Sequence, residues 1–513
     1  MNKNKLAFTF LIVGTVIYDY LFWKENFGIN VLIFSSLLMA TMVALYPQSF
    51  RNRNVLLVAI GTMLSAVFEV IHNSGSSKLI HLASFFMLIG FIHQGQLRSM
   101  IAAGLTALTN YFFIPGRIMK EIGKVKSRFR NVNKFLKLLK LTIIPLLVVI
   151  VFYIIYKNAN PVFEKYALLF LDDFFQFLTD IFRDVSLSHF LFAVFGMVLI
   201  GGAIFSNNIH HFLDADLRKT DKLIRKRRSR KIPGFAAHEP RKWVPFAILG
   251  LKNEYLMGLI LIFSVNALIL VVNIIDINWI WINFEVKEGF NLSQFVHEGT
   301  YLLILSIIIS MGILLYFFRG NLNFFKQNKW LKYGAYTWIV QNGFMVLSVA
   351  LRNYHYINHY GLAYKRIGVI VFLILVLVGL LTLYLKIQRS RSTYYLVNMN
   401  SWATYIAMIM LCFFNWDALI ARHNLNHKYQ SNMDVRFLMN LSSKALPLLL
   451  ENRDILKKEI ELYYNSPDHW ENYENRLNGK VQRFLNRYDE LSWQSWNYAD
   501  YKTYKYITEH EKI

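Results

Sequence analysis

The chain is poor in cysteine and in acidic residues. One cysteine, Cys412, occurs among 513 residues, which excludes an intramolecular disulfide and a Cys-x-x-Cys redox or zinc motif. Asp and Glu number 32 against 56 Lys and Arg, so the net charge is +24. The sequence also lacks a Walker phosphate loop, a Gly-x-Ser-x-Gly elbow, a His-Glu-x-x-His motif and a dinucleotide fingerprint. It therefore assigns no catalytic residue, no cofactor and no metal.

Long apolar runs are abundant. Hydrophobic residues make up 55% of the chain and aromatic residues 16%. A membrane-spanning helix needs roughly 20 mostly apolar residues, because its backbone groups must be paired where no water is present. We therefore predict an all-α polytopic membrane protein with about eleven transmembrane helices and a small C-terminal helical domain. The predicted spans are Leu6–Trp23, Val31–Tyr46, Val55–Ile71, Leu79–Ile92, Leu141–Tyr156, Phe190–Phe205, Tyr255–Ile275, Thr300–Phe318, Tyr333–Leu351, Val369–Leu385 and Ser401–Trp416.

The basic residues fall mostly in every second connection between these runs. With the N-terminus inside, the predicted cytoplasmic segments carry a net charge of +27 and the outer segments −1. This distribution follows the positive-inside rule, apart from one basic outer loop with Arg352, Lys365 and Arg366. Residues 417–513 contain 14 basic and 14 acidic residues, and we expect them outside. The pattern predicts a multi-pass membrane protein with a cytoplasmic N-terminus and an extracytoplasmic C-terminus.

Four segments follow from this topology. They are an N-terminal four-helix membrane segment (1–92), a basic amphipathic segment at the cytoplasmic face (93–140), seven further spans (141–416) with a basic inner loop (206–254), and an extracytoplasmic helical tail (417–513). The run Ile101–Pro115 is apolar but only 15 residues long. If it crossed the membrane, every later segment would be inverted. We interpret 101–140 instead as an element of the inner face that ends in a basic amphipathic helix.

The basic inner loops are expected to contact anionic lipid. The run Arg225–Lys231 reads RKRRSRK and invites a nucleic-acid interpretation. No recognised nucleic-acid-binding module surrounds it, so we expect a cytoplasmic loop that fixes topology and binds no nucleic acid.

Two groups of polar residues are candidate sites. Asp19 and Glu69 lie within predicted spans, where ionisable side chains are costly, and His72 and His81 flank the following outer turn. These four could bind a proton or cation, or could simply lie at the wetted interface. A second group gathers on the predicted outer face: His297, Glu298, His355, His359, Asp417, His423 and His427. His355 and His359 are four residues apart, as two metal ligands on one helix would be, but the group comes from separate segments and we expect an interfacial belt.

The tail is expected to form a small helical domain. Its apolar periodicity predicts helices around 438–449, 455–462 and 467–491, with a turn at Asn465–Asp468. An aromatic cluster follows at Trp493, Trp496, Tyr498, Tyr501 and Tyr504. Aromatic rings of this kind pack in a core or lie at a boundary between water and an apolar phase, and there they could contact headgroups or a protein partner.

Several motifs in the second half resemble those of a known family. They are Phe295–Gly299 (FVHEG), Tyr360–Ile367 (YGLAYKRI), Asn415–Asn424 (NWDALIARHN), Asp434 with Phe437–Leu438, Leu441–Ala445 (LSSKA) and Ser492–Asn497 (SWQSWN). The series resembles the bacterial multi-pass membrane proteins grouped as domain of unknown function 4173, with its relative 4153, over roughly residues 250–500. Ala363 stands where that family usually has Thr, and Ser492 and Gln494 replace a charged pair. The resemblance implies a bacterial cytoplasmic membrane protein and supplies no catalytic residues.

Three functions remain open at this level. The leading hypothesis is a non-enzymatic envelope protein whose tail binds a partner or senses the state of the envelope. The alternative is a transporter or channel for a small solute, ion or lipid, with Asp19 and Glu69 as coupling or gating groups. A second alternative is a metal-dependent enzyme of the outer face.

Overall fold

The structure is a computed structural model, and every regular element that it describes is helical. It describes residues 3–124, 186–207, 210–225, 251–282, 292–426, 433–464 and 468–510, with a few isolated residues between 145 and 163. The predicted span Leu141–Tyr156, the basic stretch 125–140 and most of the Arg225–Lys231 run lie outside these ranges. The described chain falls into two compact units, which are considered separately.

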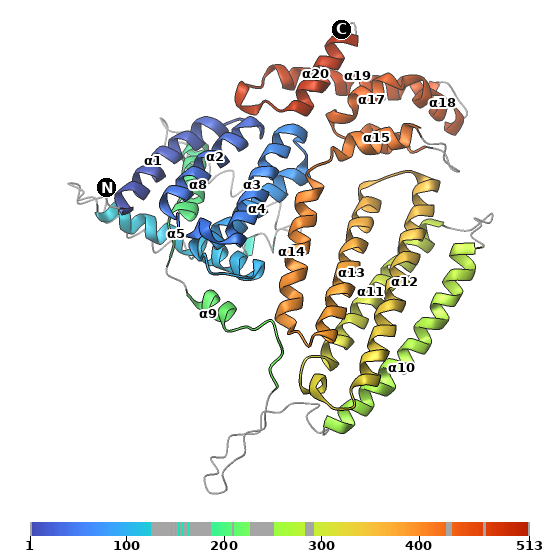
Figure 1. The fold of residues 1–513 in the computed structure, drawn as a ribbon. Coiled ribbons are helices and arrows are strands. Elements are labelled where there is room, and N and C mark those ends of the chain that lie inside the picture. The colour runs from blue at the N-terminus through green and yellow to red at the C-terminus, as the bar shows by residue number, and fades with distance from the viewer. Residues whose placement is uncertain are drawn as a thin grey trace. The chain divides into compact units, whose positions relative to one another are not determined.

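The amino-terminal unit comprises Met1–Asp216 together with Asn486–Tyr504. Its principal helices are α1 (Lys3–Phe22), α2 (Ile29–Leu45), α3 (Arg53–His72), α4 (Gly75–His93), α5 (Met100–Lys124) and α8 (Leu187–Ile204), with the short α9 (His211–Leu217) at its boundary (Figure 1). Polar caps set two of these starts. The Asn52 side chain accepts from the Asn54 amide, and Ser74 and Ser77 form a capping box at the start of α4.

Helix α5 packs into this unit. Its Ala103, Ala107 and Ile114 are fully buried. A Cβ on Gly90 of α4 would lie 2.0 Å from the Ala103 carbonyl oxygen, so only glycine permits this approach of α4 to α5. The Asn110 amide also donates to the Gly202 carbonyl at 2.9 Å, which joins α5 to α8. The location of 101–115 on the inner face stays a prediction, and the structure shows this segment packed against α4 and α8.

The carboxy-terminal unit comprises Leu217–Leu485 and Lys505–Ile513. Its long helices are α10 (Leu251–Asp276, continued by the π-helical turn Ile277–Ile282), α11 (Leu292–Phe317), α12 (Lys329–Tyr360), α13 (Tyr364–Gln388) and α14 (Thr393–Leu411). Shorter helices follow: α15 (Trp416–Asn426), α16 (Val435–Asn440), α17 (Leu446–Glu451), α18 (Arg453–Tyr464) and α19 (Asp468–Asp489). Helix α20 (Tyr498–His510) begins in the amino-terminal unit, and its last residues group with this one.

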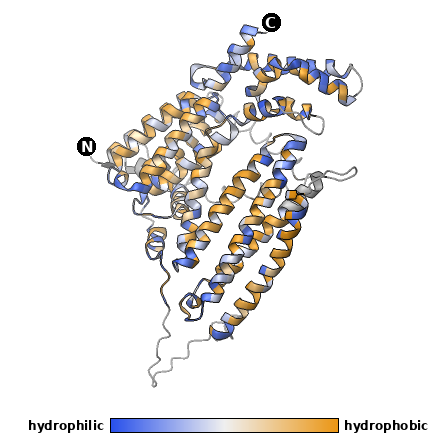
Figure 2. Cartoon of the chain, turned by 45° about the vertical axis from the view of Figure 1, so that its right-hand side comes forward, coloured by the Kyte–Doolittle hydropathy of each residue, from blue (hydrophilic) through white to orange (hydrophobic). Residues whose placement is uncertain are grey.

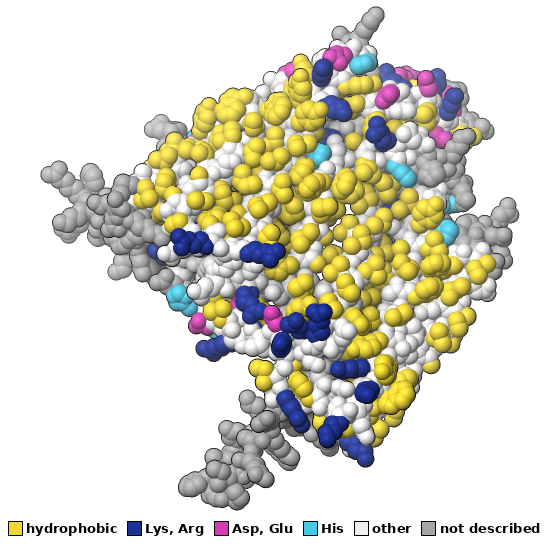
Figure 3. Space-filling model, in the orientation of Figure 1, with side chains coloured by type: hydrophobic (Ala, Val, Ile, Leu, Met, Phe, Trp, Pro, Cys, Tyr) yellow, Lys and Arg dark blue, Asp and Glu magenta, His cyan; other side chains and the backbone are white. Residues whose placement is uncertain are grey.

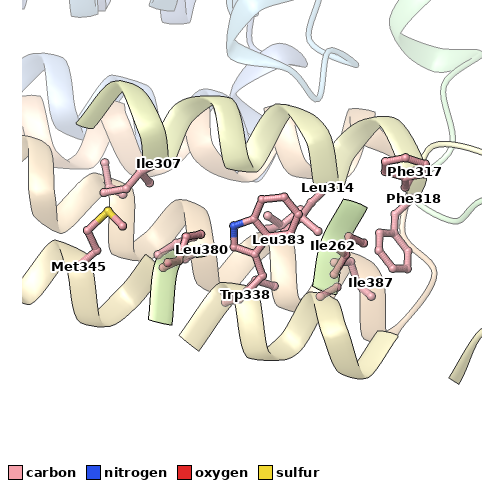
Figure 4. Close-up of a cluster of buried hydrophobic side chains, with 14 of the residues drawn as sticks. Ile262, Ile307, Leu314, Phe317, Phe318, Trp338, Met345, Leu380, Leu383 and Ile387 are labelled. Carbon is pink, nitrogen blue, oxygen red and sulfur yellow. The ribbon is translucent and has the colours of Figure 1, made fainter. Parts of the chain in front are cut away.

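The core of the carboxy-terminal unit lies between α10, α11, α12 and α13. Trp338 of α12 is fully buried, and Ile262, Leu314 and Leu383 from the three neighbouring helices surround it (Figure 4). In a membrane such helices are held together mainly by van der Waals packing, because lipid tails are as apolar as the side chains of the core. These packed helices form the bundle from which the shorter helices extend.

Five helices are long and apolar enough to cross a membrane: Arg53–His72, Gly75–His93, Leu187–Ile204, Leu251–Ile282 and Tyr364–Gln388. The pair Thr393–Leu411 and Trp416–Asn426, bent by 68°, would make a sixth. The described residues thus account for five or six spans and not for the eleven predicted. Three of the predicted runs form shorter apolar helices, Leu6–Phe22, Ile29–Leu45 and Tyr301–Phe317. Figure 2 shows the resulting contrast between the apolar long helices and the mixed helices that follow α14.

The predicted tail domain 417–513 is divided between the two units. Residues up to Leu485 pack in the carboxy-terminal unit, whereas Asn486–Tyr504 pack in the amino-terminal one. There the Ile29 amide donates to the Trp496 carbonyl at 2.8 Å, and the Ser495 hydroxyl donates to Glu25 at 2.5 Å. Ser495 is fully buried, while Trp493 and Trp496 keep 54% and 38% of their surface exposed. The SWQSWN motif therefore contacts the α1–α2 connection through the Trp496 carbonyl and the Ser495 hydroxyl.

Candidate functional site

Glu69 and His81 are both buried and make separate hydrogen bonds among α2, α3 and α4. The Ser77 hydroxyl donates to the Glu69 carboxylate, which is fully buried. His81 lies between Ser35 and Ser65, with a ring nitrogen 3.0 Å from each hydroxyl. These contacts tie three neighbouring helices together, which is a common role of polar side chains in membrane bundles.

The other two residues of that predicted cluster lie in different surroundings. The Asp19 carboxylate is 2.7 Å from Nε2 of His189, whose ring stacks on Trp23 at 4.1 Å. His72 stacks on Phe68 at a centroid distance of 6.0 Å. His189 was not singled out from the sequence, because it lies 170 positions from Asp19 and begins a separate helix. The contact of Asp19 thus joins α1 to α8, whereas that of Glu69 joins α3 to α4 and those of His81 join α4 to α2 and α3.

The structure describes only some of the side chains in the predicted outer-face group. The side chains of His297 and Glu298, and residue His427, lie outside the described part of the chain. His355 and His359 occupy the last turns of α12, and His359 packs edge-on against Tyr360. Among the residues described, the structure contains no group of three His, Cys, Asp or Glu side chains that could hold a metal ion.

Asp417 is instead the centre of a hydrogen-bonded cluster in the carboxy-terminal unit. It is 8% exposed, and it accepts from the Tyr364 hydroxyl and from the Ser442 hydroxyl at 2.6 Å. Nearby, the Asn424 side chain makes two bonds with the backbone of Leu362, at 2.7 and 3.0 Å. The YGLAYKRI, NWDALIARHN and LSSKA motifs, distant in sequence, therefore meet where α13 begins and α15 turns away.

Lys480 of α19 borders this cluster. Its ammonium donates to the Met439 carbonyl at 3.0 Å and to the Leu441 carbonyl. Burial lowers the pKa of Lys480 from 10.5 to about 8, Asp417 opposes this shift, and Arg476 and Arg483 add to it. The unfolded chain keeps this proton up to about pH 10.5, so the penalty of burying the ammonium is complete below about pH 8 and disappears by pH 10.5.

We expect acylation of Lys480 to reach half its limiting rate near pH 8. Quantifying the modified peptide by mass spectrometry across a pH series measures this midpoint. In Asp417→Asn the midpoint should fall further, because the carboxylate no longer stabilises the ammonium. A midpoint that stays the same in Asp417→Asn would show that the two groups do not interact.

A hollow of about 310 Å³ lies beside this cluster, between the shorter helices. It is lined by the start of α16, the end of α18 and one side chain of α19: Met433, Asp434, Val435, Arg436, Glu459, Ile460, Tyr463, Tyr464 and Tyr473. The Tyr464 and Tyr473 hydroxyls are 3.4 Å apart, and the Arg436 side chain lines the same hollow. No sequence pattern predicts this site as a whole. Its one local signal was Asp434, which belongs to the recognised motifs, whereas the tyrosines are brought together by the turn between α18 and α19.

Comparison with known proteins identifies one family. The domain of unknown function described as DUF4153 matches residues 33–452, which is most of the chain. No curated protein matches the sequence, and no solved structure matches the fold.

Proposed function

The chain belongs to the DUF4153 family, and we propose that this member is a non-enzymatic protein of the bacterial cytoplasmic membrane whose tail recognises a ligand or partner on the outer side. The observation that carries the proposal is the hollow beside Arg436, Tyr464 and Tyr473. It combines a guanidinium, aromatic rings and carboxylates in a concave surface, which are the usual elements of a small binding site. The tail helices around it have their own buried residues, including Leu449, Leu456 and Leu477.

The distribution of charge within the carboxy-terminal unit supports the outer location. Helices α12, α13 and α14 are joined by short connections and alternate in direction (Figure 1). The loops 319–332 and 386–391 therefore lie at one end, and α15 with the tail helices follows from the other. These two loops contain seven basic residues and no acidic one, and Figure 3 shows Lys and Arg gathered at the end of the unit where α12 begins. A basic end faces the anionic cytoplasmic leaflet, so the tail is expected outside.

The one basic outer loop has a structural explanation. Arg352 lies inside α12 and pairs with Asp276 at 2.7 Å, with both side chains buried. The Arg366 guanidinium donates to the Gly361 carbonyl and lies 4.2 Å above the Tyr356 ring. Two of the three cations in this loop thus interact with other groups of the protein. The positive charge that this loop presents to its surroundings is therefore smaller than the count of three cations suggests.

The transport alternative has less support. It requires Asp19 and Glu69 to serve as coupling groups along one path. Glu69 is held by Ser77 and Asp19 contacts His189, so the two carboxylates have separate partners. Such contacts are those of residues that join helices.

Cysteine protection tests the proposal. In a Cys412→Ser background expressed in a bacterial host, Tyr463→Cys places a thiol at the rim of the hollow. Leu462→Cys is the matched control, because Leu462 is on the same helix and equally exposed (68% against 65%) but does not line the hollow. A membrane-impermeant maleimide should label both in spheroplasts. In spent growth medium, labelling at position 463 should be slower than after washing, whereas labelling at position 462 should be the same in both.

Two outcomes would contradict the proposal. Labelling of Leu462→Cys only after permeabilisation would place the tail in the cytoplasm. Equal labelling at position 463 before and after washing would show that nothing occupies the hollow.

A further inference from the structure

The hollow contains separate features for a negative and for a positive group. Arg436, in the first turn of α16, lines the hollow together with Tyr464 of α18 and Tyr473 of α19. The two tyrosine side chains raise the pKa of Arg436, so the guanidinium keeps its charge. A guanidinium presents five donors in a planar fork, which suits a carboxylate better than a lysine ammonium does.

Asp434 and Glu459 are the features of the hollow that suit a positive group. One oxygen of Asp434 accepts from the Phe437 amide at 2.9 Å, and one oxygen of Glu459 accepts from the Met433 amide at 3.3 Å. Each carboxylate is thereby fixed by the backbone and keeps a second oxygen for a donor. The faces of the tyrosine rings that line the hollow also attract cations.

The charge and size of the hollow narrow the ligand further. Among the described residues, the lining carries one cation and two carboxylates, which favours a ligand that has an amino group as well as an anionic one. A volume of about 310 Å³ is at the small end of ligand-binding pockets. It suits a molecule with a few polar groups and a short apolar body, which Val435 and Ile460 can contact.

We infer that this hollow binds a small zwitterion with one carboxylate and one ammonium group, of the size of an amino acid or dipeptide. Arg436 takes the carboxylate, and Asp434 and Glu459 take the ammonium. The inference rests on the proposed recognition role of the tail and names the ligand class for it. Phosphocholine carries the same pair of charges on a lipid headgroup, and the experiment separates it from free amino compounds.

Isothermal titration of the purified full-length protein in nanodiscs tests the inference. The probes are L-leucine and glycyl-leucine, glycyl-leucine amide without the carboxylate, N-acetyl-glycyl-leucine without the ammonium, and phosphocholine. We expect L-leucine or glycyl-leucine to bind, and the amide and the N-acetyl compound to bind at least tenfold more weakly. Arg436→Met should weaken binding of that zwitterion by about 10- to 100-fold, the range for hydrogen bonds to charged groups. The same variant should no longer distinguish glycyl-leucine from its amide.

The controls separate this inference from the proposed function. Lys457→Met changes an exposed cation of α18 that does not line the hollow, and it should leave binding unchanged. Binding of phosphocholine in place of the amino compounds would assign the hollow to lipid headgroups and overturn the inference. Absence of binding, or binding that Arg436→Met leaves unchanged, would also overturn it. The cysteine protection described above would stand in either case, because it detects any occupant.

Discussion

Replacing Arg352 with methionine is expected to lower the free energy of unfolding by about 3–5 kcal/mol. The Arg352 guanidinium lies 2.7 Å from the Asp276 carboxylate, and the two side chains are only 9% and 6% exposed. Removing the cation leaves a carboxylate buried beside α12 without its counter-charge, and such a group is far more costly than the lost attraction alone. Equilibrium unfolding in mixed detergent micelles measures the change.

The double variant Asp276→Leu/Arg352→Met provides the decisive comparison. We expect it to recover most of the lost stability, because it removes both charges and leaves apolar groups of similar size. Lys457→Met is the control for losing an ion pair as such. Its pair with Glu461 is exposed, with the charged atoms 3.9 Å apart, and it should contribute no more than about 0.5 kcal/mol. A double variant as unstable as Arg352→Met would show that packing, and not the unpaired charge, sets the cost.

Replacing Gly28 with alanine is expected to detach the SWQSWN motif from the α1–α2 connection. A Cβ at this position would lie 2.5 Å from the carbonyl oxygens of Ser495 and Trp496, and backbone atoms cannot rotate away as a side chain can. Overpacking of this kind typically costs 1–3 kcal/mol. Amide hydrogen exchange at Ile29, which donates to the Trp496 carbonyl, should therefore accelerate about tenfold or more.

Gly75→Ala is the matched control for this substitution. Gly75 starts α4 in the same unit, and a Cβ there would have no heavy atom within 4 Å. Exchange at Ile29 should be the same in Gly75→Ala as in the unaltered protein. Equal acceleration in both variants would mean that the close contact at Gly28 does not hold the segment.

The candidate sites differ in how much of them the sequence reveals. Asp417 was predicted as an outer-face polar residue, and its motif was recognised. Its partners Tyr364 and Ser442 are 53 and 25 positions away, so no local pattern joins them. The pairing of Asp276 could not be predicted, because a carboxylate at the end of an apolar run looks the same in the sequence whether water or an arginine faces it. The hollow was not predicted, because Arg436, Tyr464 and Tyr473 come from three helices whose packing creates it.

The sequence by itself determined the all-helical class, the apolar helices that could span a membrane, the basic connections and the helical character of most of 438–464 and of 468–489. These properties are local. Helix periodicity and apolar run length depend on neighbours within a few turns, and the charge of a loop follows from counting its own acidic and basic residues. The tertiary structure alone decided which charges are paired, as with Arg352 and Asp276, and which unit each part of the tail joins. Those outcomes depend on which helix faces meet, and side chains tens or hundreds of positions apart settle that together.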